Sequence, residues 1–227
     1  MPPLLLISRE FSVSDLSATN LSKLFAQHTN LYSKRLPVYQ AEMLNSLLGV
    51  WHDHHARVLD IGGGTGIIAE AVQKFLPTDE VVSVDVVDRY FATLSIERQV
   101  YDGSHLPFSD NAFEAATINN VMHHIPRGVR PALMREIRRV VSGPVYVKDH
   151  VACTWLDHKK LTVLDAIGNI PFKGQIEAWY LSEEDWSELA TQGGYRISER
   201  SSGNYRSGLM ALLFPNRLEQ TMRFERQ

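Results

Sequence analysis

The chain has 227 residues, of which 44% are hydrophobic and 22% are charged, a balance typical of a globular domain. Its formal net charge of -3 gives no reason to expect nucleic acid as a partner, and its one cysteine, Cys153, excludes an internal disulfide. No apolar run approaches the roughly 20 residues of a membrane span, and the run at Leu4–Ile7 is too short for a signal sequence. We therefore expect a cytoplasmic protein with a single domain.

The first elements expected along the chain are helices between about Ser17 and Val50, where Pro37 suits a first helical turn and Gly49 a helix end. Short apolar runs and helical stretches alternate after them. Strands are expected at 58–61, 81–84, 99–101, 115–118, 145–147, 195–198 and 209–214, and helices at 67–75, 130–141 and 183–192. This alternation predicts an α/β fold with a doubly wound, mostly parallel seven-stranded sheet and N-terminal helices.

One segment interrupts this alternation between the fifth strand and the last helix. It runs from about Val151 to Leu181 and carries Trp155, Trp179 and Tyr180. An insertion at this point would lie over the carboxyl edge of the strands, where open α/β sheets bind their ligands. We therefore expect residues 151–181 to form a lid over a substrate.

The stretch RVLDIGGGTGIIAE, from Arg57 to Glu70, predicts a strand, a glycine turn and a helix. A dinucleotide turn of the form G-x-G-x-x-G starting at Gly62 would have Ile67 in place of its third glycine, and one starting at Gly64 would begin late. The other register is acid-x-G-x-G-x-G, formed by Asp60, Gly62, Gly64 and Gly66. An acid there suits a cationic ligand better than a pyrophosphate.

This second register resembles the first motif of the class I S-adenosylmethionine-dependent methyltransferases. Further matches follow in order as far as Pro126, including VVSVD, which ends at Asp85, and the YDG of the third strand. The resemblance implies S-adenosylmethionine as the cofactor, the ribose on Asp85 with Val86 beside it, and the adenine amino group on Asp102 with Gly103 beside it. It also implies that Asn119, at the end of the fourth strand, lies near the methionine part, and that Tyr32 and Arg35 cover the cofactor.

Two departures from the family pattern concern local structure. Only about a dozen residues link Asp85 to the third strand, so the helix usual at this point must be short or absent. The family's Phe-Asp pair is Phe113-Glu114 in this chain. Neither change removes a predicted cofactor contact.

Candidate catalytic residues lie at the ends of the fourth and fifth strands. His124 follows the fourth strand in MHHI, and Asp149 and His150 end the fifth in YVKDHV. A histidine with a pKa near neutrality suits a general base, although each of these residues also has a structural explanation as a cap or loop anchor. The WHDHH segment, Trp51 to His55, resembles a metal cluster, but we expect a solvated loop there and no metal site.

The leading functional hypothesis is methyl transfer to a small molecule in a pocket that the N-terminal helices and the insertion enclose. The expected parts of the domain are a helical cover (1–56), a cofactor-binding half (57–150), the lid (151–181), and the last helix with closing strands and tail (182–227). Three alternatives stay open: a non-catalytic partner subunit, a methyltransferase acting on RNA or protein, and a nicotinamide dehydrogenase. The charged tail is interpreted as a solvated end, with an edge strand or a homo-oligomer contact as alternatives.

Overall fold

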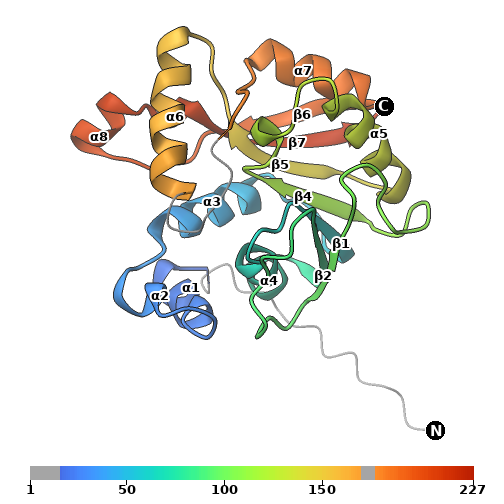
Figure 1. Cartoon of the computed structure of the whole chain (residues 1–227), viewed down its shortest axis with the longest axis horizontal. Coiled ribbons are helices and arrows are strands. Elements are labelled where there is room, and N and C mark those ends of the chain that lie inside the picture. The colour runs from blue at the N-terminus through green and yellow to red at the C-terminus, as the bar shows by residue number, and fades with distance from the viewer. Residues whose placement is uncertain (1–15, 170–176) are drawn as a thin grey trace, which may run out of the picture.

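Seven strands form one sheet in the order β3-β2-β1-β4-β5-β7-β6 (Figure 1). The computed structural model describes residues 16–169 and 177–227, so the run at Leu4–Ile7 and residues 170–176 of the expected insertion lie outside the described residues. Strands β1 to β5 are parallel, and β7 is antiparallel to β5 and β6. The strands are β1 (His55–Ile61), β2 (Thr78–Asp85), β3 (Glu97–Val100), β4 (Ala115–Asn119), β5 (Val145–His150), β6 (Tyr195–Ser201) and β7 (Glu219–Arg226). The predicted doubly wound, mostly parallel sheet is confirmed.

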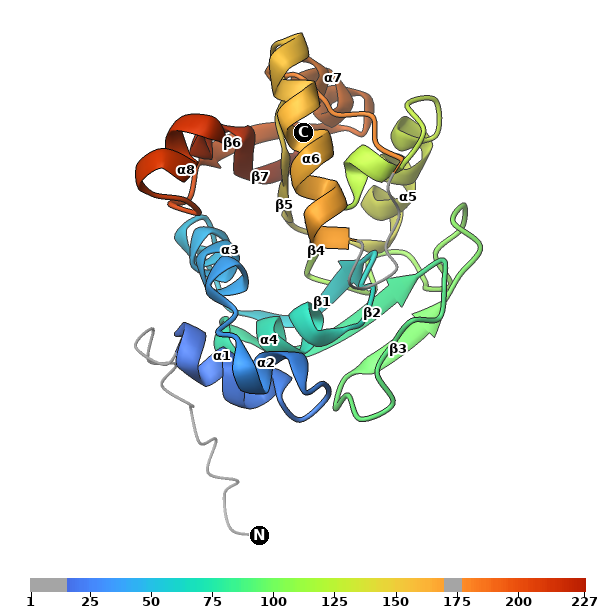
Figure 2. The same ribbon diagram turned by 60° about the vertical axis from the view of Figure 1, so that its left-hand side comes forward.

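Helices cover both faces of the sheet (Figure 2). Val58 and Val81 pack in one apolar core with α1 (Ala18–Phe25), α2 (Leu31–Lys34), α3 (Val38–Gly49) and α4 (Ile67–Phe75). Their neighbours Leu59 and Val82 face the opposite core, with α5 (Arg130–Val140) and α7 (Glu183–Gln192). Successive residues of a strand point to opposite faces, so a strand buried on both faces is apolar throughout. This explains the unbroken apolar runs in β1 and β2.

Several local predictions agree with the structure. Helices α4 and α7 begin and end at the predicted residues. Ser182 and Asp185 form a capping box at the start of α7, in which each side chain accepts a hydrogen bond from the other residue's backbone N–H. No helix lies between β2 and β3, as the short link required.

One prediction near the carboxyl end was wrong and another was only partly right. The expected strand at 209–214 is instead helix α8 (Gly208–Leu213), and its leucines are exposed. The tail, for which an edge strand, an oligomer contact and a solvated end were open, contains the short helix η4 (Asn216–Leu218) and then β7, which is a strand but an inner one. The charged residues of this segment do not suggest an inner strand. Glu219 can be buried there because it pairs with Lys148 and Arg206, and Lys148 lies far away in the sequence.

The described part of the insertion forms helix α6 (Trp155–Asn169), which lies beside the ends of β4 and β5 (Figure 2). A hydrogen bond of 3.0 Å between Asp165 and the Nε2 atom of His150 ties α6 to the end of β5. The insertion is therefore at the carboxyl edge of the sheet, as predicted. Within 16–169 and 177–227, no helix is both long enough and apolar enough to cross a bilayer.

Candidate functional site

The glycine turn between β1 and α4 requires glycine at three positions. Gly62, Gly64 and Gly66 have φ angles of 76°, 58° and 82°, which side chains disfavour. A Cβ atom on Gly62 would approach Val121 to 2.4 Å, and one on Gly66 would approach Leu94 to 2.4 Å. Nothing lies within 4 Å of a Cβ built on Gly64. Packing therefore explains Gly66, whereas Gly64 borders open space.

A cavity of about 330 Å³ lies against this turn, at the carboxyl edge of the sheet. This size is in the range of small-molecule sites. Its wall combines the glycine turn, the ends of β2 and β4, and residues from α2 and α3. The lining residues are Tyr32, Tyr39, Gln40, Met43, Ile61, Gly62, Gly63, Gly64, Thr65, Ile67, Ile68, Asp85, Val86, Arg89, Tyr101, Asn119, Asn120, Val121, His124 and Ile125.

Asp85 connects the cavity wall to the glycine turn. Its Oδ2 atom accepts a hydrogen bond of 2.7 Å from the backbone N–H of Gly64, and its Oδ1 atom accepts one of 3.0 Å from Val87. Its Oδ2 atom also lies 3.8 Å from Nη2 of Arg89, and the next residue, Val86, lines the cavity as well. Each carboxylate oxygen can accept more than one hydrogen bond, so Asp85 keeps capacity for a ligand hydroxyl.

Asn119 and Tyr32 line other parts of the same cavity. Neither polar atom of the Asn119 side chain makes a hydrogen bond of good geometry within the described part of the chain. The amide lies near the carboxylate of Asp60, whose pKa it helps to lower, and it keeps capacity for a polar ligand. The hydroxyl of Tyr32 accepts a hydrogen bond from Gln40, and burial raises the pKa of Tyr32.

Five predicted cofactor residues do not line the cavity: Arg35, Asp60, Gly66, Asp102 and Gly103. Arg35 and Asp102 are exposed. The carboxylate of Asp102 accepts backbone hydrogen bonds from Ser104 and His105, which lower its pKa to about 2. Asp102 thus stabilises its own turn, and Tyr101 is the residue of this segment that reaches the wall.

Asp60 lies beneath the turn and also stays outside the cavity lining. Its two oxygens accept hydrogen bonds of 2.8 Å from the hydroxyls of Ser83 and Thr117. Burial raises the pKa of Asp60 to about 6, although both hydrogen bonds oppose the rise. Its carboxylate therefore braces β1 against β2 and β4, and any effect on a cationic ligand would act through space.

Asp60 should give the stability of the protein a distinct pH dependence. Because its pKa rises from 3.8 to about 6 on folding, the folded state binds the extra proton between these values. The contribution of this proton to the free energy of unfolding is therefore complete below pH 3.8 and is lost as the pH rises through about 6. We expect the difference in unfolding free energy between the wild type and Asp60→Asn to change over this range, as urea unfolding would measure. A difference that is constant from pH 4 to pH 7 would contradict the raised pKa.

Of the three predicted catalytic residues, His124 alone lines the cavity. It lies in the short helix η2 (Met122–His124), directly after β4. Its Nδ1 atom is 2.8 Å from the carbonyl oxygen of Glu177. Burial, and secondarily His123, lower the pKa of His124, which favours a neutral imidazole.

The structure places Asp149 and His150 behind the cavity wall, where both are buried. Asp149 accepts hydrogen bonds from the backbone of Met122 and from the Nδ1 atom of His123. Burial by itself raises the pKa of Asp149, but the nearby His123 and His150 hold it well below its ordinary value. Both residues therefore anchor η2 and α6 and do not reach the cavity. The adjacent histidines of MHHI were the available clue to His123, which the sequence analysis missed.

A second polar group that the sequence analysis missed surrounds Lys148. Its ammonium group is fully buried and lies 2.5 Å from the hydroxyl of Tyr39 and 2.7 Å from Oδ1 of Asn120. It also pairs with Glu219, whose other oxygen pairs with Arg206. Tyr39 and Asn120 line the cavity, so this buried network holds part of its wall.

The WHDHH segment does not form a metal cluster. His52 and His54 are exposed and lie near Glu199 and Asp79, respectively. His55 is buried against Tyr146, with its Nε2 atom 2.9 Å from the tyrosine hydroxyl. Each histidine therefore has a different neighbour.

Comparisons with known proteins concern first the segment that carries the glycine turn. A family model described as a methyltransferase domain matches residues 58–143, which hold β1 to α5. The match identifies this segment as a methyltransferase domain of the class I S-adenosylmethionine-dependent type. The sheet order and the antiparallel β7 are those of this cofactor-binding fold.

Individual family members are similar over different lengths. The ubiquinone/menaquinone biosynthesis C-methyltransferase UbiE of Desulfotalea psychrophila is 32% identical over 93 residues, covering 38% of this chain and 37% of UbiE. The magnesium protoporphyrin IX methyltransferase of Synechocystis PCC 6803, solved with S-adenosylhomocysteine, has a TM-score of 0.59 at 15% identity and covers 88% of each chain. A chain in the complex of the Haloferax volcanii Trm112 activator with a putative methyltransferase reaches 0.61 at 13% identity, with coverage of 96% and 97%. These structural likenesses show the shared fold.

Proposed function

We propose that this protein transfers the methyl group of S-adenosylmethionine to a small-molecule acceptor. The observation that carries the proposal is the cavity at the glycine turn, where Asp85 and Asn119 present polar groups beside apolar and aromatic walls. The UbiE and protoporphyrin enzymes, whose names describe methyl transfer to small molecules, support this acceptor class. The net charge of -3 shows no overall excess of the basic residues that would favour RNA as the acceptor.

In this proposal each end of the cavity has its own task. Asp85 would accept hydrogen bonds from the ribose hydroxyls, with Val86 and Tyr101 near the base, and Asn119 would bind the methionine end. S-adenosylmethionine would supply an electrophilic methyl group on its sulfonium. Tyr39, Asn120 and His124 would face the acceptor and hold its nucleophilic atom for in-line attack, which mainly requires positioning.

The electron and proton balance of this reaction is simple. A lone pair of the acceptor forms the new bond to the methyl carbon while the carbon–sulfur bond breaks and leaves its electron pair on sulfur. The proton of the acceptor passes to a base or to water. A neutral His124 is suited to accept it, because its pKa is lowered and it lines the cavity.

Calorimetric titration of the purified protein with S-adenosylhomocysteine, with NAD as the control, tests the cofactor assignment. We expect micromolar affinity for S-adenosylhomocysteine and none for NAD, because the turn lacks the third glycine of a dinucleotide site. Binding of NAD alone would overturn the proposal. Transfer of labelled methyl groups to a panel of small acceptors would then separate an enzyme from a non-catalytic partner subunit. The single-domain organisation, the lid role of 151–181, the cytoplasmic location and any homo-oligomer stay predictions.

A further inference from the structure

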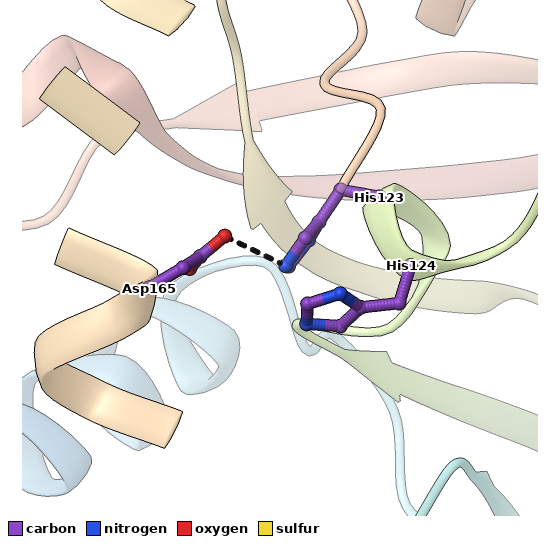
Figure 3. Close-up of side chains that lie close together, drawn as sticks. All are labelled: His123, His124 and Asp165. Atoms are coloured by element: carbon purple, nitrogen blue, oxygen red, sulfur yellow. Dashed lines mark ion pairs between the residues drawn. The ribbon is translucent and has the colours of Figure 1, made fainter. Parts of the chain in front are cut away.

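A compact group of potential metal ligands lies between η2 and α6. His123, His124 and Asp165 each present one donor atom, and these three atoms all lie within 4.8 Å of one another. Figure 3 shows His123 pointing toward Asp165, with the ring of His124 beside them. The rings of His123 and His124 are 4.0 Å apart between centroids. Helix α6 and η2 are far apart in the sequence, so only the fold brings these donors together.

His123 is oriented as histidine ligands of metals usually are. Its Nδ1 atom faces the carboxylate of Asp149, which can only accept a hydrogen bond when ionised. The proton of a neutral ring is therefore on Nδ1, and the lone pair is on Nε2. The Nε2 atom is buried and has no hydrogen-bond partner in the described ranges 16–169 and 177–227. It lies 3.4 Å from Oδ2 of Asp165. Either a proton on Nε2, which would make this contact an ion pair, or a metal cation between the two atoms would satisfy this buried nitrogen.

His124 has the same kind of orientation through a different acceptor. Its Nδ1 atom lies 2.8 Å from the carbonyl oxygen of Glu177, and a carbonyl can only accept. The proton of a neutral ring is therefore on Nδ1, and Nε2 carries the lone pair. Both adjacent histidines thus have Nδ1 held by an oxygen atom and Nε2 in the form that binds a metal.

Asp165 is also held in place by its neighbours. Its Oδ1 atom accepts a hydrogen bond of 3.0 Å from Nε2 of His150, and its Oδ2 atom accepts one from the hydroxyl of Tyr180. Carboxylate ligands in metal sites are commonly supported in this way. Together with Asp149, the cluster buries two carboxylates, whose charge one divalent cation would balance.

We propose that Nε2 of His123, Nε2 of His124 and a carboxylate oxygen of Asp165 bind a divalent transition-metal ion of the Zn²⁺ type. Two ligand atoms on a tetrahedral Zn²⁺ are roughly 3.3–3.5 Å apart, given metal–ligand distances of about 2.0–2.2 Å. The distance of 3.4 Å between His123 and Asp165 fits this spacing. A set of two histidines and one carboxylate leaves at least one coordination position open. Since His124 lines the cavity, the open position would adjoin the proposed acceptor site. With the ion bound, His124 acts as a ligand and not as a base.

Titration of chelator-treated protein with Co²⁺ and Zn²⁺ tests this site directly. We expect one equivalent of Co²⁺ to give the intense visible absorption of a tetrahedral ion, Zn²⁺ to displace it, and Zn²⁺ to raise the melting temperature. Asp165→Asn and His124→Gln should each weaken metal binding roughly 100-fold or more, because each replaces a charged or strongly donating ligand. The double variant His52→Ala/His54→Ala removes two exposed histidines and should bind like the wild type.

The outcomes separate this inference from the cofactor assignment. Absence of stoichiometric binding, unchanged affinity in Asp165→Asn, or loss of binding in the His52/His54 control would each overturn the metal site. The cluster would then be a network of hydrogen bonds and charged histidines. Asp165 does not line the cavity, so Asp165→Asn should still bind S-adenosylhomocysteine, which also shows that the variant is folded. Failure of the metal site thus leaves the proposed function untouched.

Discussion

Replacement of Glu219 by glutamine is expected to lower the free energy of unfolding by about 3–5 kcal/mol, the usual cost of breaking a buried ion pair. Glutamine keeps the shape of the side chain but removes the charge that pairs with the fully buried Lys148 and with Arg206. Total stabilities are about 5–15 kcal/mol, so this loss is a large fraction. Urea unfolding at neutral pH would measure it.

Glu225 provides a matched control on the same strand. It pairs with the exposed Arg196 and, through its other oxygen, with the largely buried Arg223, so Glu225→Gln should cost clearly less than Glu219→Gln, whose partner Lys148 is fully buried. A triple variant, Lys148→Met with Arg206→Met and Glu219→Leu, should recover most of the lost stability, because it removes all three charges of the buried network together. If Glu219→Gln were as stable as Glu225→Gln, the buried network would not hold β7 in the sheet as the structure indicates.

The second large effect is expected for Asp85→Ala, which should weaken binding of S-adenosylhomocysteine by about 1.5–3 kcal/mol, or roughly 10- to 150-fold. The variant loses the proposed acceptor of the ribose hydroxyls. It also loses the hydrogen bond of 2.7 Å that holds the backbone of Gly64 in the turn. Calorimetry with the folded variant would measure the change.

Asp88 is the natural control because it is exposed, lies three residues after Asp85 in the link that follows β2, and does not line the cavity. Asp88→Ala should leave the affinity unchanged. Asp85→Asn keeps an oxygen that can accept the hydrogen bond from Gly64, so its affinity for S-adenosylhomocysteine should lie between those of the wild type and Asp85→Ala. Equal affinities of the wild type and Asp85→Ala would remove the ribose assignment.

The part of the site nearest the glycine turn was predictable from the sequence. Asp85, Val86, Gly62, Gly64 and Asn119, which the family resemblance implied, all line the cavity, and each lies at the end of a parallel strand or shortly after it. The carboxyl ends of parallel strands meet at one edge, so residues at those ends converge without further information. The same rule failed for Asp149 and His150, because being at the edge does not decide which side chains point into the cavity.

Other features depended on partners distant in the chain. Asp102 looked like a ligand residue, but it is exposed outside the cavity lining, and one of its oxygens accepts from the backbone N–H groups two and three residues later. His123, next to the predicted His124, became a candidate metal ligand only because the fold places it between Asp149 and Asp165 of α6. No local pattern shows which loop will cover a given strand end.

The alternation of strands and helices and the glycine turn could be predicted from hydrophobic periodicity and backbone sterics, which act between residues close together in the chain. The class of cofactor came from the resemblance of the turn and the motifs after it to a known family. Only the tertiary structure decided that the charged tail becomes the inner strand β7, that Lys148 meets Glu219 across 71 residues, and that His123 faces Asp165. Burial of a charge is favourable only beside its partner, and folding of the whole chain is what brings the partners together.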